Sequence, residues 1–304
     1  MEIAEGSSHG GPKADPAYHP VPAPLAGTLG YLLHRAHVRS SGVAWQLLPE
    51  GSHPKHFAVL EMLDATRFGS QLELAEALCV NRTIMVSIVD QLAEDGYVER
   101  RRNPEDRRRY LLELSAAGRS HLAALRARAG DGNQLLTAPL STAEVAGLND
   151  LLRPIALQRL THDIPDELLN LTAFLVVYGH FHMASLAAPR LSAKLGMHPR
   201  HHAVLAVLAD LGPVPQQRLA AEMQVGGATV VEIIDALEET GRVRRRPGTD
   251  DRRTNDLVVT AKGHRDLAKS DDILRGVEAD ALKALSAPGR DQLVTLLHKL
   301  VTGS

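Results

Sequence analysis

The sequence predicts a mainly α-helical protein in which two domains of the same build are fused in one chain. Its 304 residues suffice for about two domains of roughly 150 residues each. Aromatic residues make up only 3% of the chain while 44% is hydrophobic, so the cores must consist of leucine, valine and alanine, which suit helices. The chain also repeats itself at an offset of 145 residues, which aligns Gly96 with Gly241. A period far above the roughly 20 to 50 residues of solenoid repeats indicates a duplicated domain.

The repeat runs through the chain without a gap. Its densest match is 93–100 against 238–245, followed by an Asp-Arg-Arg sequence at 106–108 and again at 251–253. Other identical pairs include His53-Pro54 with His198-Pro199, Gln71 with Gln216, Asp90 with Asp235, and Gly118 with Gly263. We therefore divide the chain into an N-terminal arm (1–24), a first repeat (25–158), a linker (159–169) and a second repeat (170–304).

The first repeat should open with helices. The arm before it is predicted to be disordered, because glycine, serine, histidine and five prolines leave few apolar side chains to bury. A helix is expected from Leu25 to about Arg39, with 170–184 as its counterpart. Three short helices should follow, the first with a proline in its first turn and the third ending before Gly96. Their expected ranges are 54–66, 71–78 and 81–94.

After Gly96 the pattern changes to the alternation typical of strands. Segments 97–102 and 110–114 flank a polar Asn-Pro-Glu-Asp tip and predict a hairpin. Three short helices followed by a hairpin indicate a winged helix-turn-helix, with the hairpin as its wing. Two more helices, 115–129 and 142–158, should close the repeat. Serines and threonines at their N-cap positions support these starts: Ser115 and Ser141 in the first repeat, Thr260 and Ser286 in the second.

Charge and cysteine content narrow the class of protein. The 34 basic and 36 acidic residues balance, so a nucleic-acid site would have to arise from local charge. The single cysteine, Cys79, permits no internal disulfide, which fits a reducing compartment. The sequence shows neither a signal peptide nor an apolar run of about 18 residues. We therefore expect a cytoplasmic protein with no membrane partner.

The order of these elements and the motifs within them resemble the MarR family of transcriptional regulators. The motifs are Leu-x-x-x-Gly-x-Val-x-Arg at 92–100 and 237–245, the Asp-Arg-Arg of the wing, and the Leu/Val-Ser/Thr-Ala-x-Gly sequence after it. The resemblance covers about 25–157 and 170–302. It implies a regulator whose recognition helices and wings contact double-stranded DNA, and whose outer helices form a shared dimerisation-like core. Because members are typically homodimers, two fused copies imply a monomeric pseudo-dimer.

Arginines on both sides of each hairpin are the main candidates for DNA contact. Guanidinium groups on a narrow hairpin suit phosphates and the minor groove, and such binding depends strongly on salt. One arginine in each wing, for which Arg107 and Arg252 are candidates, is equally open to a structural role in its own domain. The predicted contacts are Arg101, Arg102, Arg107 and Arg108 in the first wing, and Arg245, Arg246, Arg252 and Arg253 in the second.

The two predicted recognition helices carry different side chains. Glu232 stands in the second where Ser87 stands in the first, and a carboxylate repels phosphate, although it can accept a hydrogen bond from a cytosine amine. Either the operator is asymmetric with the first repeat dominant, or DNA binding has faded. The polar candidates are Asn81, Arg82, Thr83 and Ser87 in the first helix, whereas the second has Gly226, Gly227 and Ala228 at the first three of these positions and Thr229 as the polar residue of its first turn.

The resemblance also implies a small-molecule effector, bound in a crevice between the opening helices, the second helix and the winged lobe. Aromatic and imidazole side chains on these segments suit a planar, phenol-like or anionic ligand. An equally open interpretation is that they are packing residues at the fused interface. The predicted ligand-binding residues are Tyr31, His34, His37, Trp45 and His56 in the first repeat, and Tyr178, His182, His201 and His202 in the second.

The sequence predicts no metal site, no cofactor and no catalytic residue. Several of the 15 histidines are spaced by three or four residues, as zinc ligands on a helix are, but too few cysteines and carboxylates lie nearby to complete a tetrahedral set. Cys79 is expected to be a buried turn residue rather than a redox switch, since Gln224 takes its place in the second repeat.

Two functions follow. The first is a ligand-responsive DNA-binding regulator, a repressor, in which the effector biases an equilibrium between DNA-competent and incompetent states. The alternative is a scaffold that has lost specific DNA binding and serves as a small-molecule binder or enzyme, with pocket histidines as acid or base. The repeated wings favour the regulator over the enzyme, and the altered second recognition helix favours the alternative.

Overall fold

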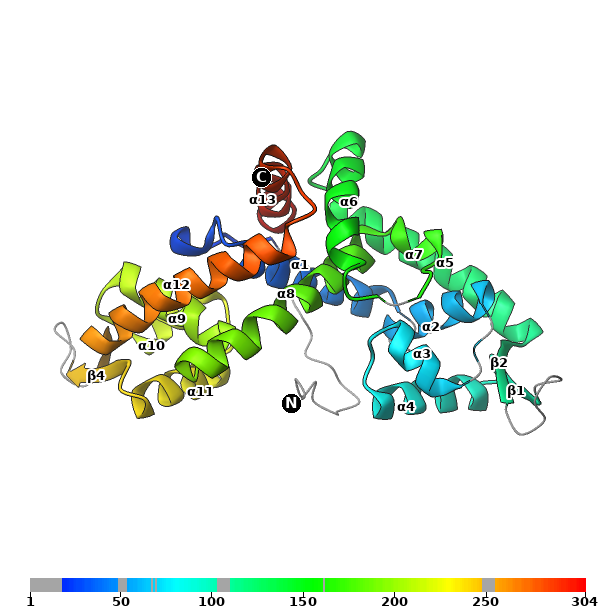
Figure 1. Cartoon of the computed structure of the whole chain (residues 1–304), viewed down its shortest axis with the longest axis horizontal. Helices are drawn as coiled ribbons and strands as arrows, with labels where there is room; N and C mark the ends of the chain where they lie inside the picture. Colours follow the sequence, from blue (N-terminus) through cyan, green and yellow to red (C-terminus); the bar gives the residue numbers. More distant parts are fainter. Residues whose placement is uncertain are drawn as a thin grey trace. The chain divides into compact units, whose positions relative to one another are not determined.

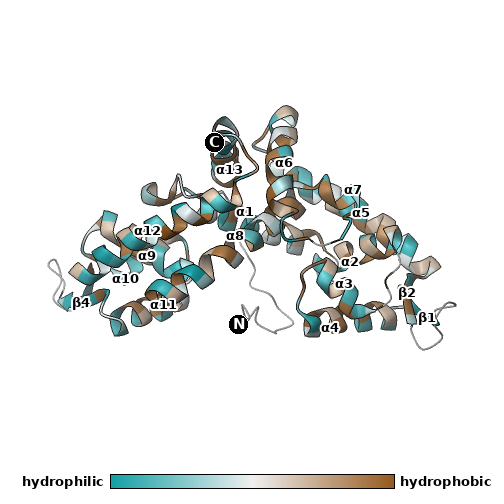
Figure 2. Ribbon diagram, in the orientation of Figure 1, coloured by the Kyte–Doolittle hydropathy of each residue, from teal (hydrophilic) through white to brown (hydrophobic). Residues whose placement is uncertain are grey.

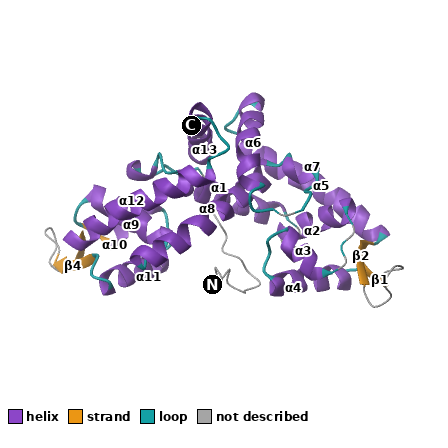
Figure 3. Cartoon of the chain, in the orientation of Figure 1, coloured by secondary structure: helices purple, strands orange, loops and turns teal. Residues whose placement is uncertain are grey.

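The computed structural model describes residues 18–48, 54–66, 68, 70–102, 110–160, 162–247 and 255–304. Helices make up most of this part of the chain, with strands at β1, β2 and β4 (Figure 3). The predicted mainly α fold with two winged helix-turn-helix lobes is confirmed. None of the described helices is long and apolar enough to cross a membrane.

The described chain divides into two compact units, unit 1 with residues 36–177 and unit 2 with residues 18–35 and 178–304. The division cuts both long helices: α1 (Leu29–Leu47) begins in unit 2 and ends in unit 1, and α8 (Thr172–Leu195) does the reverse. The units therefore differ from the repeats of the sequence, because each unit contains the start of the long helix that opens the other repeat.

Unit 1 contains the first winged lobe. In its hairpin the strands are antiparallel, with Val98 opposite Leu114 and Arg102 opposite Tyr110, and Phe68 forms a bridge to Leu112. Besides the end of α1 and the start of α8, this unit contains α2 (Pro54–Ala65), α3 (Gln71–Ala77), α4 (Arg82–Glu94), β1 (Val98–Arg102), β2 (Tyr110–Leu114), α5 (Ala116–Thr137), α6 (Thr142–Ala156) and α7 (Asp166–Leu169) (Figure 1).

Unit 2 repeats this order, with an antiparallel sheet in the strand order β3-β5-β4. Residues 1–17 of the predicted disordered arm lie outside the described residues. Its last residues differ from the prediction, because Pro22 is buried and Ala23 begins η1, whose Leu25 is fully buried in the core of this unit. The elements are η1 (Ala23–Leu25), α9 (Pro199–Leu211), β3 (Val214–Pro215), α10 (Gln216–Met223), α11 (Gly227–Glu239), β4 (Val243–Pro247), β5 (Asn255–Val259), α12 (Ala261–Ala281) and α13 (Ala287–Thr302).

Four helices begin at the predicted N-caps. The side chains of Ser115, Ser141, Thr260 and Ser286 each accept a hydrogen bond from a backbone N–H of the first turn, which satisfies a donor that the helix itself cannot. Three helices extend further than predicted, since α1 continues to Leu47, α5 to Thr137 and α8 to Leu195. Within α5, Gly132 lies where an added Cβ would be 3.2 Å from the Leu47 side chain, so it serves close helix packing.

Each long helix is capped by a side chain of the other repeat. The Leu29 N–H at the start of α1 donates to Glu278 Oε1 at 2.9 Å, and the Ala173 N–H at the start of α8 donates to Asn133 Oδ1 at 3.2 Å. Glu278 and Asn133 are equivalent at the offset of 145 residues. Burial raises the pKa of the Glu278 carboxyl, although the backbone donors of α1 oppose this. In each unit, one such hydrogen bond thus holds the start of the long helix that opens the other repeat.

The cores are aliphatic, as the composition predicted. In unit 2 the core joins η1 and the end of α8 to α9, α10, α11 and the wing, and its members are leucine, valine, isoleucine, methionine and alanine. Hydrophobic and hydrophilic residues share the same helices (Figure 2), so each helix can bury one face and expose the other.

Candidate nucleic-acid interface

The exposed edge of α4 carries all four predicted contact residues of the first recognition helix. Asn81 precedes the helix as its N-cap, where its Oδ1 accepts from the Thr83 N–H at 2.8 Å. Arg82, Thr83 and Ser87 are exposed. The opposite face is held in the core by Met85, Ile88, Val89 and Leu92. Burial of this face turns the polar edge of α4 to solvent.

The exposed edge of α11 has a different chemistry. Gly226 occupies the N-cap position and provides no side chain to cap the helix. Thr229 is exposed as predicted, and so are Glu232 and Val231, the latter to 39%. The buried face, Val230, Ile233, Ile234 and Leu237, matches that of α4 position for position. The two helices therefore pack alike and differ on the side that faces solvent.

The arginines of the wings fall into three groups. Arg101, Arg102 and Arg246 are exposed on β1 and β4, as a DNA contact requires. Arg101 also pairs with Glu99 at 3.1 Å and with Glu113 at 3.6 Å, which offsets part of its charge. The predicted contacts Arg107, Arg108, Arg252 and Arg253 lie outside the described residues.

The third group consists of Arg100 and Arg245, which form ion pairs within their own lobes. Arg100 pairs with Asp90, which also accepts from Gln71 at 3.4 Å. The equivalent Arg245 donates to Asp235 at 2.7 Å and to Gln216 at 3.5 Å.

Arg100, Asp90 and Gln71 form a polar triad in the first lobe, and Arg245, Asp235 and Gln216 form it in the second. The triad joins β1 or β4 to the recognition helix and to the start of the helix before it. Glu238 strengthens it in the second lobe, where it binds both the guanidinium and the backbone N–H of Arg245. Three of the identities in the self-alignment thus make one contact set. The sequence leaves an internal role open for Arg107 and Arg252, which lie outside the described residues. Among the described wing residues, Arg100 and the predicted DNA contact Arg245 form these pairs.

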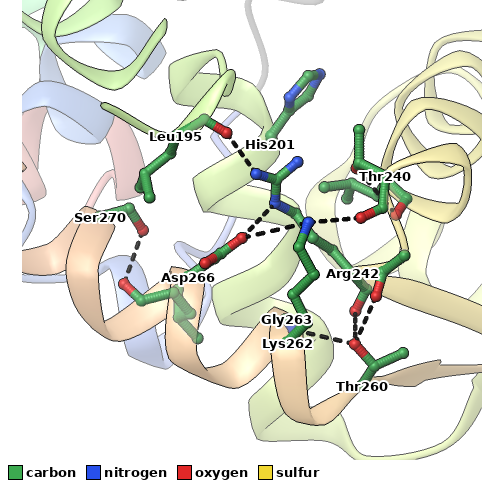
Figure 4. A network of polar contacts seen from close by, with 12 residues as sticks. Leu195, His201, Thr240, Arg242, Thr260, Lys262, Gly263, Asp266 and Ser270 are labelled. Atoms are coloured by element: carbon green, nitrogen blue, oxygen red, sulfur yellow. Dashed lines mark hydrogen bonds and ion pairs between the residues drawn. The ribbon is translucent and has the colours of Figure 1, made fainter. Parts of the chain in front are cut away.

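The base of each wing meets the following helix at a second junction, which Figure 4 shows for the second lobe. In the second lobe the guanidinium of Arg242, only 4% exposed, donates through Nε to Asp266 Oδ2 at 2.9 Å and also to the Leu195 carbonyl at the end of α8. Lys262 donates to the Thr240 carbonyl at 2.6 Å beside it.

In the first lobe the equivalent residues are Tyr97 and His121, whose rings stack with centroids 4.1 Å apart. Burial lowers the pKa of His121, which favours the neutral ring. A neutral aromatic stack and a buried ion pair thus occupy the same place.

One glycine in each lobe allows this junction to form. A Cβ on Gly118 would lie 2.0 Å from the Tyr97 carbonyl oxygen, and one on Gly263 would lie 2.2 Å from that of Arg242. Both distances are shorter than any non-bonded contact. The identity of Gly118 and Gly263 in the sequence therefore reflects a close approach of helix and wing.

The predicted ligand-binding residues are divided between the units. Tyr31 and His34 belong to unit 2 with Tyr178, His182, His201 and His202, whereas His37, Trp45 and His56 belong to unit 1. The first-repeat set therefore does not form a single cluster within one unit. A shallow hollow of about 340 Å³ in unit 2 is lined by other residues, namely Ala26, Val294, Thr295, His298, Lys299 and Ser304.

Within unit 2, two histidine groups have defined contacts. The rings of His34 and His180 lie 5.2 Å apart. His202 is buried, with Nδ1 at 2.9 Å from Ser270 Oγ and 3.7 Å from Asp271 Oδ1. Burial lowers the pKa of His202 and Asp271 opposes this. A hydrogen-bonded neutral imidazole is the favoured state of His202.

His198 and His201 form a reciprocal cap at the start of α9. The Arg200 N–H donates to His198 Nδ1 at 3.3 Å, and the His198 N–H donates to His201 Nδ1 at 3.2 Å. Burial and the nearby Arg200 lower the pKa of His201 to about 4. His198, the residue before Pro199, is thus the N-cap of α9.

In unit 1, His56 is buried to 3% exposure on α2 and Trp45 is 39% exposed on α1. Cys79 lies in a turn with a φ of 48°, as predicted, and its Sγ donates to the Arg159 carbonyl at 3.0 Å. Burial raises the pKa of this thiol, which disfavours the reactive thiolate. Across the described ranges, no three His, Cys, Asp or Glu side chains gather as a metal ion would need.

Two winged lobes with polar recognition edges define a helix-turn-helix DNA-binding protein, and comparison with known proteins gives the family. The sequence model of the MarR family matches residues 53–110 and 197–254, once in each repeat. A Thauera aromatica protein described as "Putative transcriptional regulatory protein for hcr operon" is 33% identical over 131 residues, covering 42% of this chain and 79% of the relative. The HTH-type regulator YkoM of Bacillus subtilis is 32% identical over 108 residues, covering 36% of this chain and 70% of the relative.

Among solved structures, the repressor CouR bound to a 23-mer DNA duplex shares 24% identity, with a TM-score of 0.41, over 45% of this chain and 96% of CouR. The chain belongs to the MarR family and carries two MarR domains in tandem. It is a DNA-binding transcriptional regulator of the MarR type. Its relatives are regulators and not enzymes, which decides against an enzyme on this scaffold.

Proposed function

We propose that this MarR-type regulator is a repressor in which a single chain supplies both DNA-contacting lobes. The exposed polar edge of α4, with Arg82, Thr83 and Ser87 in the same lobe as the arginines of β1, carries the proposal. Polar side chains on a helix suit base edges, and basic ones on the adjoining strand suit phosphates. Because the second repeat provides another lobe of the same framework, we expect a monomeric pseudo-dimer.

Binding to labelled DNA from upstream of its own gene, measured by fluorescence anisotropy, tests the proposal. The double variant R101A/R102A should weaken binding to all sequences and lower the slope of log affinity against log salt by about 2, because each arginine neutralises about one phosphate. R275A removes an exposed arginine of α12 and is the control. The absence of any specific binding at low salt would overturn the proposal, and raised expression of the neighbouring gene on deletion would support repression.

We also propose a small aromatic or anionic effector in contact with the predicted histidines and tyrosines of unit 2. Neutral, partly buried imidazoles suit hydrogen bonds to a phenol-like group, and the lowered pKa values of His201 and His202 keep these rings neutral near pH 7. A screen of small molecules for a rise in melting temperature identifies the ligand. H34A should then weaken the ligand response more than DNA affinity, and an equal loss of both would contradict the site.

A further inference from the structure

The helices α4 and α11 keep the same buried positions, all apolar, and differ in chemistry on the exposed edge. Both helices run for 13 residues, and their four buried positions coincide at the offset of 145 residues. The lobes therefore present the same backbone with different side chains. Exposed Arg82, Thr83 and Ser87 on α4 correspond to exposed Gly227, Ala228 and Glu232 on α11.

Direct reading of bases needs side chains that reach the floor of the major groove. Arg82 provides a guanidinium, which suits guanine, and Thr83 and Ser87 provide hydroxyl groups. At the same three places α11 has no side chain, a methyl group and a carboxylate. Thr229 is the remaining polar residue in its first turn. The edge of α11 therefore has little with which to read a base sequence.

The charges on α11 also disfavour base reading by this helix. The span of α11, Gly227–Glu239, contains four acidic residues and no basic one: Glu232, Asp235, Glu238 and Glu239. Two of these acids hold Arg245, which lowers the charge that β4 can offer to phosphate. In the first lobe Ala93 replaces Glu238, and Arg82 adds a positive charge at the start of α4. Glu232 is exposed where a recognition helix approaches DNA and repels phosphate there.

Resting on the proposed DNA-binding function, we propose that the chain reads a DNA site of unequal halves. The α4 lobe reads base sequence in one half-site. The α11 lobe holds the other half through its wing, by contacts to the sugar-phosphate backbone that carry no sequence information. The preferred DNA is therefore a single specific half-site with an adjoining duplex of any sequence, rather than a palindrome.

The test uses the full chain and the site located by footprinting. Anisotropy gives the dissociation constant for the native duplex, for two duplexes in which one half-site or the other is scrambled, and for one in which the adjoining half is removed. Scrambling the α4 half should weaken binding at least about tenfold, since mismatched base pairs each cost a substantial factor. Scrambling the other half should change it less than about threefold, whereas removing it should weaken binding and reduce the salt slope.

Matched variants identify the lobes. R82A should remove most of the tenfold discrimination, while G227A, at the equivalent position and with open space around an added Cβ, should leave it unchanged. E232S places the first-lobe residue in the second lobe and should tighten binding to every duplex that keeps the adjoining half, and leave binding to the duplex without it unchanged. Equal losses on scrambling either half would overturn the inference while leaving the repressor intact. No specific binding to any duplex would instead refute the proposed function itself.

Discussion

The winged lobes of the first and second repeats keep the same internal framework and differ in two places. Both have the arginine–aspartate–glutamine triad, the glycine under the wing and the same buried face on the recognition helix. The exposed edge of that helix has changed, and so has the junction where a stack of Tyr97 on His121 corresponds to a pair of Arg242 with Asp266. The framework positions match in the two lobes because they fix the backbone geometry. The recognition edge and the junction have different side chains in the same space.

The junction is the largest internal difference. The ion pair of Arg242 and Asp266 is buried, so its charges have lost most of their hydration and depend on each other and on the Leu195 carbonyl. The stack of Tyr97 and His121 requires no such compensation. The second lobe is therefore the more sensitive to the loss of one partner.

R242A should have the largest effect on this comparison, because it removes the buried cation of Asp266 and leaves only Lys262, which is exposed and 3.7 Å away. Breaking a buried pair in this way costs about 3–5 kcal/mol in the free energy of unfolding. R246A, which removes an exposed arginine of the same strand, is the matched control and should change stability by less than about 0.5 kcal/mol. Urea unfolding followed by circular dichroism measures both.

The double variant R242M/D266L distinguishes pairing from packing. Apolar residues of similar volume often replace a buried pair at no cost in stability. Recovery of most of the stability lost in R242A is therefore expected. A loss below about 1 kcal/mol in R242A itself would show that the two junctions are equivalent in energy.

The glycine under each wing should give the second largest effect, and the same effect in both lobes. G118A and G263A would force a Cβ against a backbone carbonyl, and overpacking of this kind costs about 1–3 kcal/mol or more. The control is G276A in α12, where an added Cβ meets open space and alanine should stabilise the helix by about 1 kcal/mol. Unequal losses in thermal or urea unfolding would show that the framework has diverged too.

The repeat, the order of helices, the wing and the four N-caps could be predicted from the sequence, because these depend on local patterns and on the comparison of one copy with the other. The exchange of α1 and α8 between the units could not, since it depends on contacts such as Leu29 with Glu278 that are distant in sequence. For the same reason the sequence prediction placed in one site ligand residues of the first repeat that the structure divides between two units. The internal role of Arg245 was missed, although its identity with Arg100, together with those of Asp90 and Gln71, was a usable signal.

A smaller effect concerns the acid stability of the second lobe. His201 accepts the His198 N–H through Nδ1, so protonation removes a cap bond of α9. Since the pKa of His201 in the folded protein is lowered to about 4, its contribution is present above the unfolded value of about 6.5 and is lost as the pH falls from 6.5 through 4. H201Q keeps an acceptor that does not titrate. Its melting temperature should equal that of the parent at pH 7 and exceed it near pH 4.

The control for acid stability is H264Q, at an exposed position of α12, which should follow the parent at every pH. If H201Q lost as much stability as the parent between pH 6.5 and 4, the cap would not be the titrating element. Buried His202 and the half-buried His198 would then be the remaining causes in this unit, since burial lowers the pKa of both.

The smallest expected effect concerns Glu238, which the triad of the second lobe has and that of the first lacks. Because Arg245 and Glu238 are both partly exposed, their coupling in a double-mutant cycle of E238A and R245A should be about 0.2–1 kcal/mol, and it should fall with added salt. The reverse change, A93E, places a carboxylate one helical turn from Asp90 and should create a coupling of similar size with Arg100. If A93E couples to Arg100 and E238A uncouples Arg245, one acidic residue accounts for the difference between the two triads. A cycle energy of zero in the second lobe would mean that Asp235 and Gln216 hold Arg245 without Glu238, and that the two triads are equivalent in energy.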